Sequence, residues 1–134
     1  MLNYENFLLE KRIDQLSARV EITLGFDVIK TNHAEDRQNF SDRNLGTPNQ
    51  TFISNLELKE FVRFFIKEIS TGIISGDIKD NTEFVIRSFD KELAMAIVAK
   101  EQSNAYWKLI IKTVFRESIQ EPFRVGREQI VFDK

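Results

Sequence analysis

The sequence predicts an α+β domain in which helices pack on one face of a three- to four-stranded antiparallel sheet. Two observations predict this fold class. Between Ser54 and Ile73, apolar side chains recur with the 3.6-residue period of an amphipathic helix. Between residues 83 and 115, three segments rich in β-branched and aromatic residues follow one another with short polar connections.

The first 43 residues predict a helix, a strand and a second helix. Residues 4–18 carry apolar side chains at roughly helical spacing, at Phe7, Leu8, Ile13 and Leu16. Residues 19–30 alternate apolar and polar side chains as a strand does, and Gly25 indicates a turn or bulge. A helix is expected from about residue 33, with Thr31 or Asn32 as its N-cap.

The middle of the chain predicts a loop and then the long helix. Residues 44–51 are rich in Gly, Pro, Asn and Thr, which indicates a loop. Ser54 precedes Glu57 by three residues, the spacing of a capping box at a helix start. The helix is expected to cover 54–72, and Gly72 and Gly76 indicate its end.

The remaining segments predict the sheet. Strands are expected over 83–89, 92–100 and 105–115, with "EQSN" at 101–104 as a short hairpin connection. A final short strand is expected within 127–133, "REQIVFD".

Length and composition predict one domain over 1–134, with an N-terminal helix at 1–18 and an α+β core at 19–134. The chain has 134 residues, of which 42% are hydrophobic and 30% are charged. It lacks an apolar segment near the roughly 18 residues that a membrane span needs, so we expect no membrane partner. Cysteine is absent, which excludes disulfides, thiol catalysis and Cys-based zinc sites, and the cytoplasm is the expected location.

The charge distribution gives no global nucleic-acid signature. The net charge is −2, although residues 100–134 hold seven basic and five acidic side chains, a local balance of +2. Phosphate-binding glycine loops and a GxSxG elbow are also absent, and one histidine without cysteine disfavours a transition metal. We therefore expect no cofactor and no metal.

His33 and the basic residues around it form the remaining candidate site. A helix from residue 33 places His33 and Arg37 on one face, four residues apart. A regular strand over "AYWKLIIKTVFRES" places Lys108, Lys112 and Arg116 on one face, where they could line a groove for a polyanion. Its other face would carry Trp107, Thr113 and Phe115. The alternatives are a surface histidine, the ordinary polar face of a half-buried strand, and a core role for Trp107.

Short motifs in the chain resemble those of a known class of nucleases. The order strand, "HAEDR", Arg43, a helix ending in "SGDI", then "FVIR", "LAMAIVAK" and "WKLIIKTVFRES" resembles small prokaryotic and phage domains of RelE-like fold. This class of metal-independent endoribonucleases includes the phage enzyme RegB and the colicin-type tRNA nucleases. The resemblance covers about residues 20–117. It implies that His33, Arg37 and Arg43 belong to the "HAxxR…R" element, and that Thr113 and Arg116 lie on the last strand of the motif.

Two functions of different classes follow. The leading hypothesis is an RNA-cleaving or RNA-binding protein. The resemblance implies that a phage encodes it, and it would then act in the host cytoplasm. His33, Arg37 and Arg116 would be catalytic, and Arg43, Lys108, Lys112 and Thr113 would bind phosphate. The alternative is a protein-binding module that inhibits a host enzyme, with Phe64, Ile74 and Phe123 as candidates for an exposed apolar patch. RNA is thus one expected partner and a protein the other.

Overall fold

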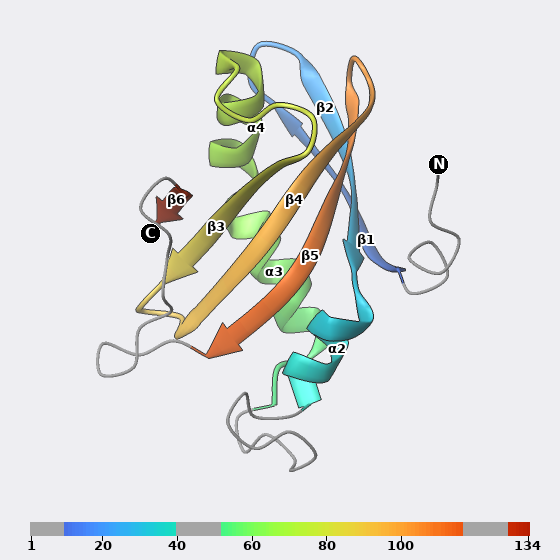
Figure 1. Ribbon diagram of the computed structural model, residues 1–134. Helices are drawn as coiled ribbons and strands as arrows, with labels where there is room; N and C mark the ends of the chain where they lie inside the picture. The colour runs from blue at the N-terminus through green and yellow to red at the C-terminus, as the bar shows by residue number, and fades with distance from the viewer. Residues whose placement is uncertain (1–9, 40–51, 117–128) are drawn as a thin grey trace.

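The computed structural model describes residues 10–39, 52–116 and 129–134 (Figure 1). Two strands come first, then three helices, then four strands. In chain order these are β1 (Lys11–Arg19), β2 (Thr23–Lys30), α2 (Asn32–Asn39), α3 (Asn55–Phe64), α4 (Ile66–Ser75), β3 (Thr82–Ser88), β4 (Leu93–Ser103), β5 (Tyr106–Arg116) and β6 (Ile130–Asp133).

The strands form one six-stranded mixed sheet in the order β1-β2-β5-β4-β3-β6. The β1–β2, β5–β4 and β4–β3 pairs are antiparallel, whereas β2–β5 and β3–β6 are parallel. The α+β class is confirmed, but the predicted RelE-like sheet of three or four antiparallel strands is wrong. The two parallel pairs join strands that are distant in the chain, and a strand's own residue pattern does not specify such a partner.

The helix predicted over 4–18 is wrong for the part that the structure describes, because β1 begins at Lys11. The register between β1 and β2 shifts between Arg12 and Asp14, which is a β-bulge at Ile13. In a regular strand Ile13 and Leu16 would lie on opposite faces. The bulge places both against the core, and it thereby reproduces the three-residue spacing that a helix would show. That residues 1–134 form one domain stays a prediction.

The predicted long helix is present as two helices. The Ser54 hydroxyl accepts a hydrogen bond from the Glu57 amide at 3.1 Å, which confirms the predicted cap of α3. The helix is interrupted at Phe65, whose amide bonds to the Val62 carbonyl three residues back. Gly76 ends α4 with φ of 87°, a conformation that other residues adopt only with strain. Gly72 lies inside α4 rather than at its end.

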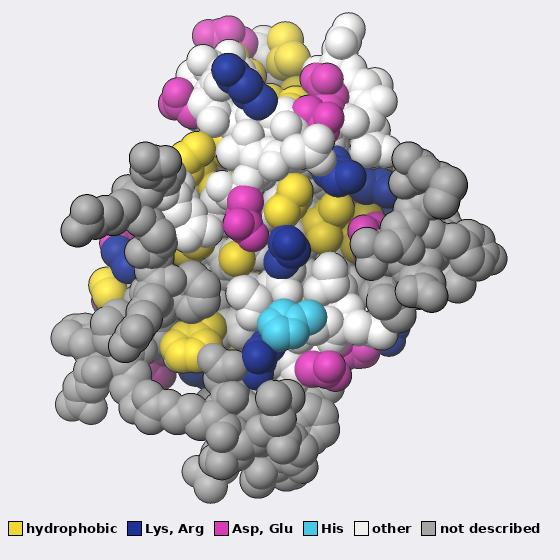
Figure 2. Space-filling model, in the orientation of Figure 1, with side chains coloured by type: hydrophobic (Ala, Val, Ile, Leu, Met, Phe, Trp, Pro, Cys, Tyr) yellow, Lys and Arg dark blue, Asp and Glu magenta, His cyan; other side chains and the backbone are white. Residues whose placement is uncertain are grey.

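Among the described elements, helices cover one face of the sheet, and the opposite face also holds buried side chains such as Val85 and Ala94. Helices α3 and α4 lie behind the sheet in Figure 1, and the main core forms between them and the strands. Fully buried aromatic and aliphatic side chains fill it, among them Phe26, Phe61, Phe65, Phe84 and Met95. We call the opposite side, toward the viewer in Figures 1 and 2, the open face. Helix α2 follows β2 and lies beside the end of β5.

Candidate functional site

The start of α2 is tied to β5 by Thr31. The Thr31 amide donates to the Ile111 carbonyl at 3.1 Å, and its hydroxyl lies 3.3 Å from the Lys112 carbonyl. The same hydroxyl accepts from the Ala34 amide at 3.2 Å, so Thr31 is the predicted cap of the helix. One residue therefore begins the helix and fixes it to a strand 80 positions later.

His33 and Arg37 are in contact on the exposed side of α2, as their spacing predicts. Arg37 Nε donates to His33 Nε2 over 3.4 Å. Figure 2 shows the histidine (cyan) at the surface with Lys or Arg side chains near it. An exposed imidazole beside a guanidinium can take a proton from a hydroxyl group while the guanidinium pairs with a phosphate.

A buried lysine holds α2 against the rest of the domain. Lys30, only 5% exposed, donates to Gln38 Oε1 at 2.9 Å and to Asn55 Oδ1 at 2.8 Å. The Glu35 carboxylate lies 3.7 Å from the same ammonium group. Gln38 in turn donates to the Ile53 carbonyl at 2.9 Å. The network joins β2, α2 and the start of α3, so it fixes the position of the helix that carries His33.

Glu35 carries a perturbed carboxyl group within this network. A hydrogen bond from Lys11 Nζ at 2.7 Å is the main cause that lowers the pKa of Glu35 below its usual value, and the charge of Lys30 adds to the effect. The carboxylate is thus held in its ionised form between two ammonium groups, one exposed and one buried.

The structure separates the three basic residues that the strand pattern places on one face. The register between β4 and β5 shifts where Ala96 pairs with Thr113 and Ile97 pairs with Ile111, so Lys112 forms a β-bulge without a partner. Lys108 is on the open face, whereas Arg116 pairs with the core residue Leu93 and is on the covered side.

Arg116 is engaged on the covered side. Its guanidinium donates to the Phe52 carbonyl at 3.0 Å and forms an ion pair with Glu57 at 3.0 Å. The prediction that Lys108, Lys112 and Arg116 share a face is wrong, because the bulge at Lys112 reverses the alternation beyond it.

Other predicted residues have mixed outcomes. Thr113 is half-buried on the open face, where it pairs with Ala96, and Lys112 is exposed. Trp107 is 4% exposed and belongs to the core, as the core alternative predicts. Arg43 lies outside the described residues. The structure therefore brings together His33, Arg37 and the strand segment at Lys112 and Thr113.

A second polar cluster, not predicted from the sequence, lies on the open face. Tyr106 donates its hydroxyl hydrogen to Asp27 Oδ1 at 2.8 Å and accepts from Gln15 Nε2 at 2.6 Å. Arg12 forms an ion pair with Asp27 at 3.2 Å. The signal was present in "LGFDVIK", because a glycine and an aspartate inside an apolar strand indicate a close backbone approach and a buried polar contact.

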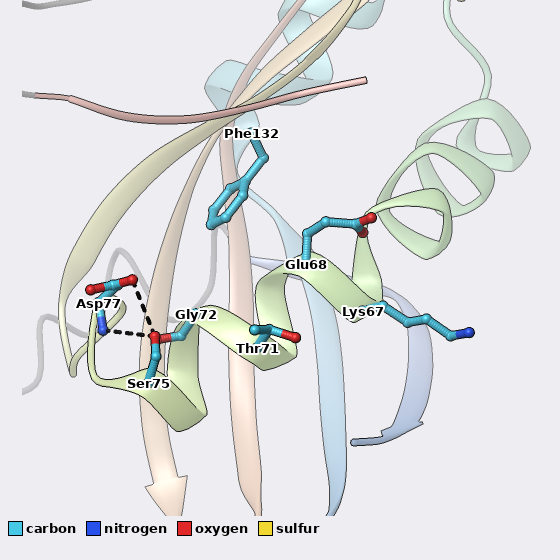
Figure 3. A pocket seen from close by; sticks show the side chains of 7 residues that line it. All are labelled: Lys67, Glu68, Thr71, Gly72, Ser75, Asp77 and Phe132. Carbon is cyan, nitrogen blue, oxygen red and sulfur yellow. Dashed lines mark hydrogen bonds between the residues drawn. The ribbon is translucent and has the colours of Figure 1, made fainter. Parts of the chain in front are cut away.

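A hollow of about 300 Å³ lies between α4, the turn after it and β6 (Figure 3). It is lined by Lys67, Glu68, Thr71, Gly72, Ser75, Asp77 and Phe132. Ser75 and Asp77 bond to each other, and Glu68 Oε1 pairs with Lys134 at 3.0 Å. Glu68 Oε2 is buried without a partner among the described residues. None of the predicted site residues lines this hollow, and most of its polar groups are already paired.

The described residues contain no group of three or more His, Cys, Asp or Glu side chains that could hold a metal ion. Within the same residues, no helix is long and apolar enough to cross a membrane. Comparison with protein-family models, curated proteins and solved structures finds no match. The residues themselves must carry the functional argument.

Proposed function

We propose that the protein binds RNA and cleaves it by a metal-independent reaction centred on His33. The observation that carries the proposal is the Thr31 tether, which brings the His33–Arg37 pair alongside the exposed Lys112 bulge. An exposed imidazole, a half-buried guanidinium and an exposed ammonium group are then carried by neighbouring elements. This is the chemistry that recognises a phosphodiester and moves a proton beside it. The motif resemblance supports the same assignment.

In the proposed reaction, His33 acts as the general base. It takes the proton of a ribose 2′-hydroxyl, whose oxygen then attacks the adjacent phosphorus. The bond from phosphorus to the 5′-oxygen of the next nucleotide breaks, and this leaving oxygen takes up a proton from water, while the proton on His33 returns to solvent. The products are a 2′,3′-cyclic phosphate and a 5′-hydroxyl. Arg37 and Lys112 would offset the negative charge that develops on the phosphate oxygens. Arg116 has no part in this scheme, since Glu57 already neutralises it.

The test is cleavage of mixed RNA in excess EDTA by the wild-type protein, His33→Ala and Asn32→Ala. Asn32 is exposed next to His33, so its variant is a matched control for a change at the helix start. Loss of the base should lower the cleavage rate about 10²-fold or more, while Asn32→Ala should keep it. Wild-type cleavage that survives in His33→Ala would show that His33 is not the base.

One observation favours the alternative function, a protein-binding module. Phe52 and Leu56 are 53% and 61% exposed at the start of α3, and large apolar side chains that remain in solvent are typical of docking surfaces. Phe64, which was predicted for this role, is 38% exposed, and the ammonium groups of Lys91 and Lys134 lie 4.6 and 4.2 Å from its ring.

The structure describes one of the other two residues predicted for such a patch. Ile74 packs against the core, and Phe123 lies outside the described residues. If the wild-type protein leaves RNA intact, binding of a purified candidate enzyme that is lost in Phe52→Ser/Leu56→Ser would favour the alternative.

A further inference from the structure

The Tyr106 side chain lies across the sheet rather than standing away from it. Tyr106 belongs to β5, and its neighbour on β2 is Gly25. A Cβ atom at Gly25 would meet Tyr106 Cδ2 at 2.8 Å, closer than Cβ atoms approach in real structures, and Cε2 at 3.0 Å, a tight contact. Beyond Gly25, the tyrosine hydroxyl reaches Asp27 on β2 and Gln15 on β1. The ring therefore extends over β2 along the open face, in space that only a glycine leaves free.

The ring is also held in place before any ligand arrives. Its hydroxyl bonds to both Asp27 and Gln15, and Asp27 is fixed by Arg12 through contacts of 3.2 and 3.3 Å. A side chain that is already ordered loses little conformational entropy when a ligand packs on it. Such anchoring suits a rigid platform.

Lysines lie next to this ring on the same face. In register, Asp27 pairs with Lys108, and Lys108 pairs with Lys100 across to β4. Neither lysine forms an ion pair within the residues that the structure describes. The carboxylate of Asp27 is offset by Arg12, so it does not cancel the positive charges of Lys108 and Lys100. Phosphate groups would be attracted to the two lysines while a base contacts the ring.

We propose that Tyr106 is a base-stacking platform for single-stranded RNA, with Lys108 and Lys100 contacting its phosphates. The inference rests on the proposed function and names its substrate class. A base can pack on a protein ring only where it is unstacked from its own neighbours, so duplex RNA is excluded. From Tyr106 to Lys112 along β5 is about 20 Å at 3.3 Å per residue, so a strand of several nucleotides would connect the platform with His33.

The test is binding of a fluorescent single-stranded RNA and of a hairpin of the same composition, measured by anisotropy. His33→Ala is the background, so that the RNA stays intact. Tyr106→Leu removes the ring but keeps an apolar side chain, and Tyr106→Phe keeps the ring but removes the hydroxyl. Thermal unfolding of each variant checks that it is folded.

The expected result separates stacking from the structural role of the hydroxyl. Tyr106→Leu should bind single-stranded RNA about 5- to 150-fold more weakly, the worth of one stacked base. Tyr106→Phe should stay within about threefold of the background protein, because stacking needs the ring and a Phe ring still fits over Gly25 when the hydroxyl bonds are lost. A 2-aminopurine in the RNA should be quenched by the background protein and by Tyr106→Phe, but not by Tyr106→Leu.

Three results would overturn the inference. Equal weakening by the Phe and Leu substitutions would show that the hydroxyl contacts matter and the ring does not. If the hairpin bound as tightly as the single strand, single-stranded RNA would not be the preferred substrate. Unchanged binding by Tyr106→Leu would refute the platform and leave the proposed function standing, whereas no RNA binding by the background protein would refute both.

Discussion

Replacing the buried Lys30 with methionine should lower the stability of the whole domain. The substitution keeps an unbranched side chain of similar length but removes the ammonium group, which is 5% exposed and donates to Gln38 and Asn55. Gln38, 2% exposed, is left with an acceptor that has no donor within the described residues. Asn55 keeps a donor, since Gln38 Nε2 reaches it at 3.0 Å.

The expected loss of stability follows from the Gln38 side-chain oxygen, which loses its hydrogen-bond donor. A buried polar atom that loses its partner costs about 1–3 kcal/mol in the free energy of unfolding. For a domain of this length, 1 kcal/mol corresponds to roughly 4 °C, so the melting temperature should fall by about 4–12 °C. Urea unfolding can be followed by fluorescence of the single tryptophan, Trp107, which is buried in the core.

Lys11→Met is the matched control, because Lys11 binds the same Glu35 carboxylate from the surface. Its side chain is 52% exposed, and exposed ion pairs contribute about 0–1 kcal/mol. The reasoning is refuted if Lys30→Met unfolds at the wild-type urea concentration, or if Lys11→Met is destabilised as strongly as Lys30→Met.

Two further predictions concern a titrating group and a helix end. The pKa of Glu35 is lowered in the folded protein, mainly by the hydrogen bond from Lys11. The ionised carboxylate therefore stabilises the fold at pH values above its usual pKa of 4.5. This stabilisation is lost as the pH falls through the lowered pKa of the folded state. Glu35→Gln should therefore be less stable than wild type at pH 6 and should lose less stability between pH 5 and 3; parallel profiles from urea unfolding would contradict this. Gly76→Ala should cost about 1–2 kcal/mol, because φ is 87° there and nothing lies within 4 Å of the added Cβ. Gly76→Asn should cost less, and equal losses in the two variants, measured by thermal unfolding, would show that backbone strain is not the cause.

The sequence predicted those helices and strands whose apolar side chains recur at regular spacing. The stripe that starts at Ser54 and the cap at Glu57 gave the long helix, and β-branched runs gave β3, β4, β5 and the short β6. The break at Phe65 was not predictable, because neither proline nor glycine precedes it. The error at β1 has a specific cause, since a bulge at Ile13 imitates helical spacing in a strand.

In the candidate site, too, contacts within one element were predictable, and contacts that depend on strand pairing were not. His33 and Arg37 are four residues apart on one helix, and their contact follows from helix geometry alone. The separation of Lys108 from Arg116 depends on a bulge that only the pairing of β5 with β4 defines. Tyr106 and Asp27 are 79 positions apart, and the parallel pairing that joins them has no local signature.

The central position of β5 has a consequence for synthesis on the ribosome. Strand β5 is the fifth of the six strands that the structure describes, yet it joins the β1–β2 pair to the β4–β3 pair. Until it emerges, the nascent chain can form only two separate two-stranded pairs, which are marginally stable in water and expose unpaired edges at β2 and β4. The segment from Tyr106 onward is therefore needed before the strands that precede it can form one sheet. Chains that stop before Tyr106 should be substrates for chaperones and proteases rather than partly folded domains.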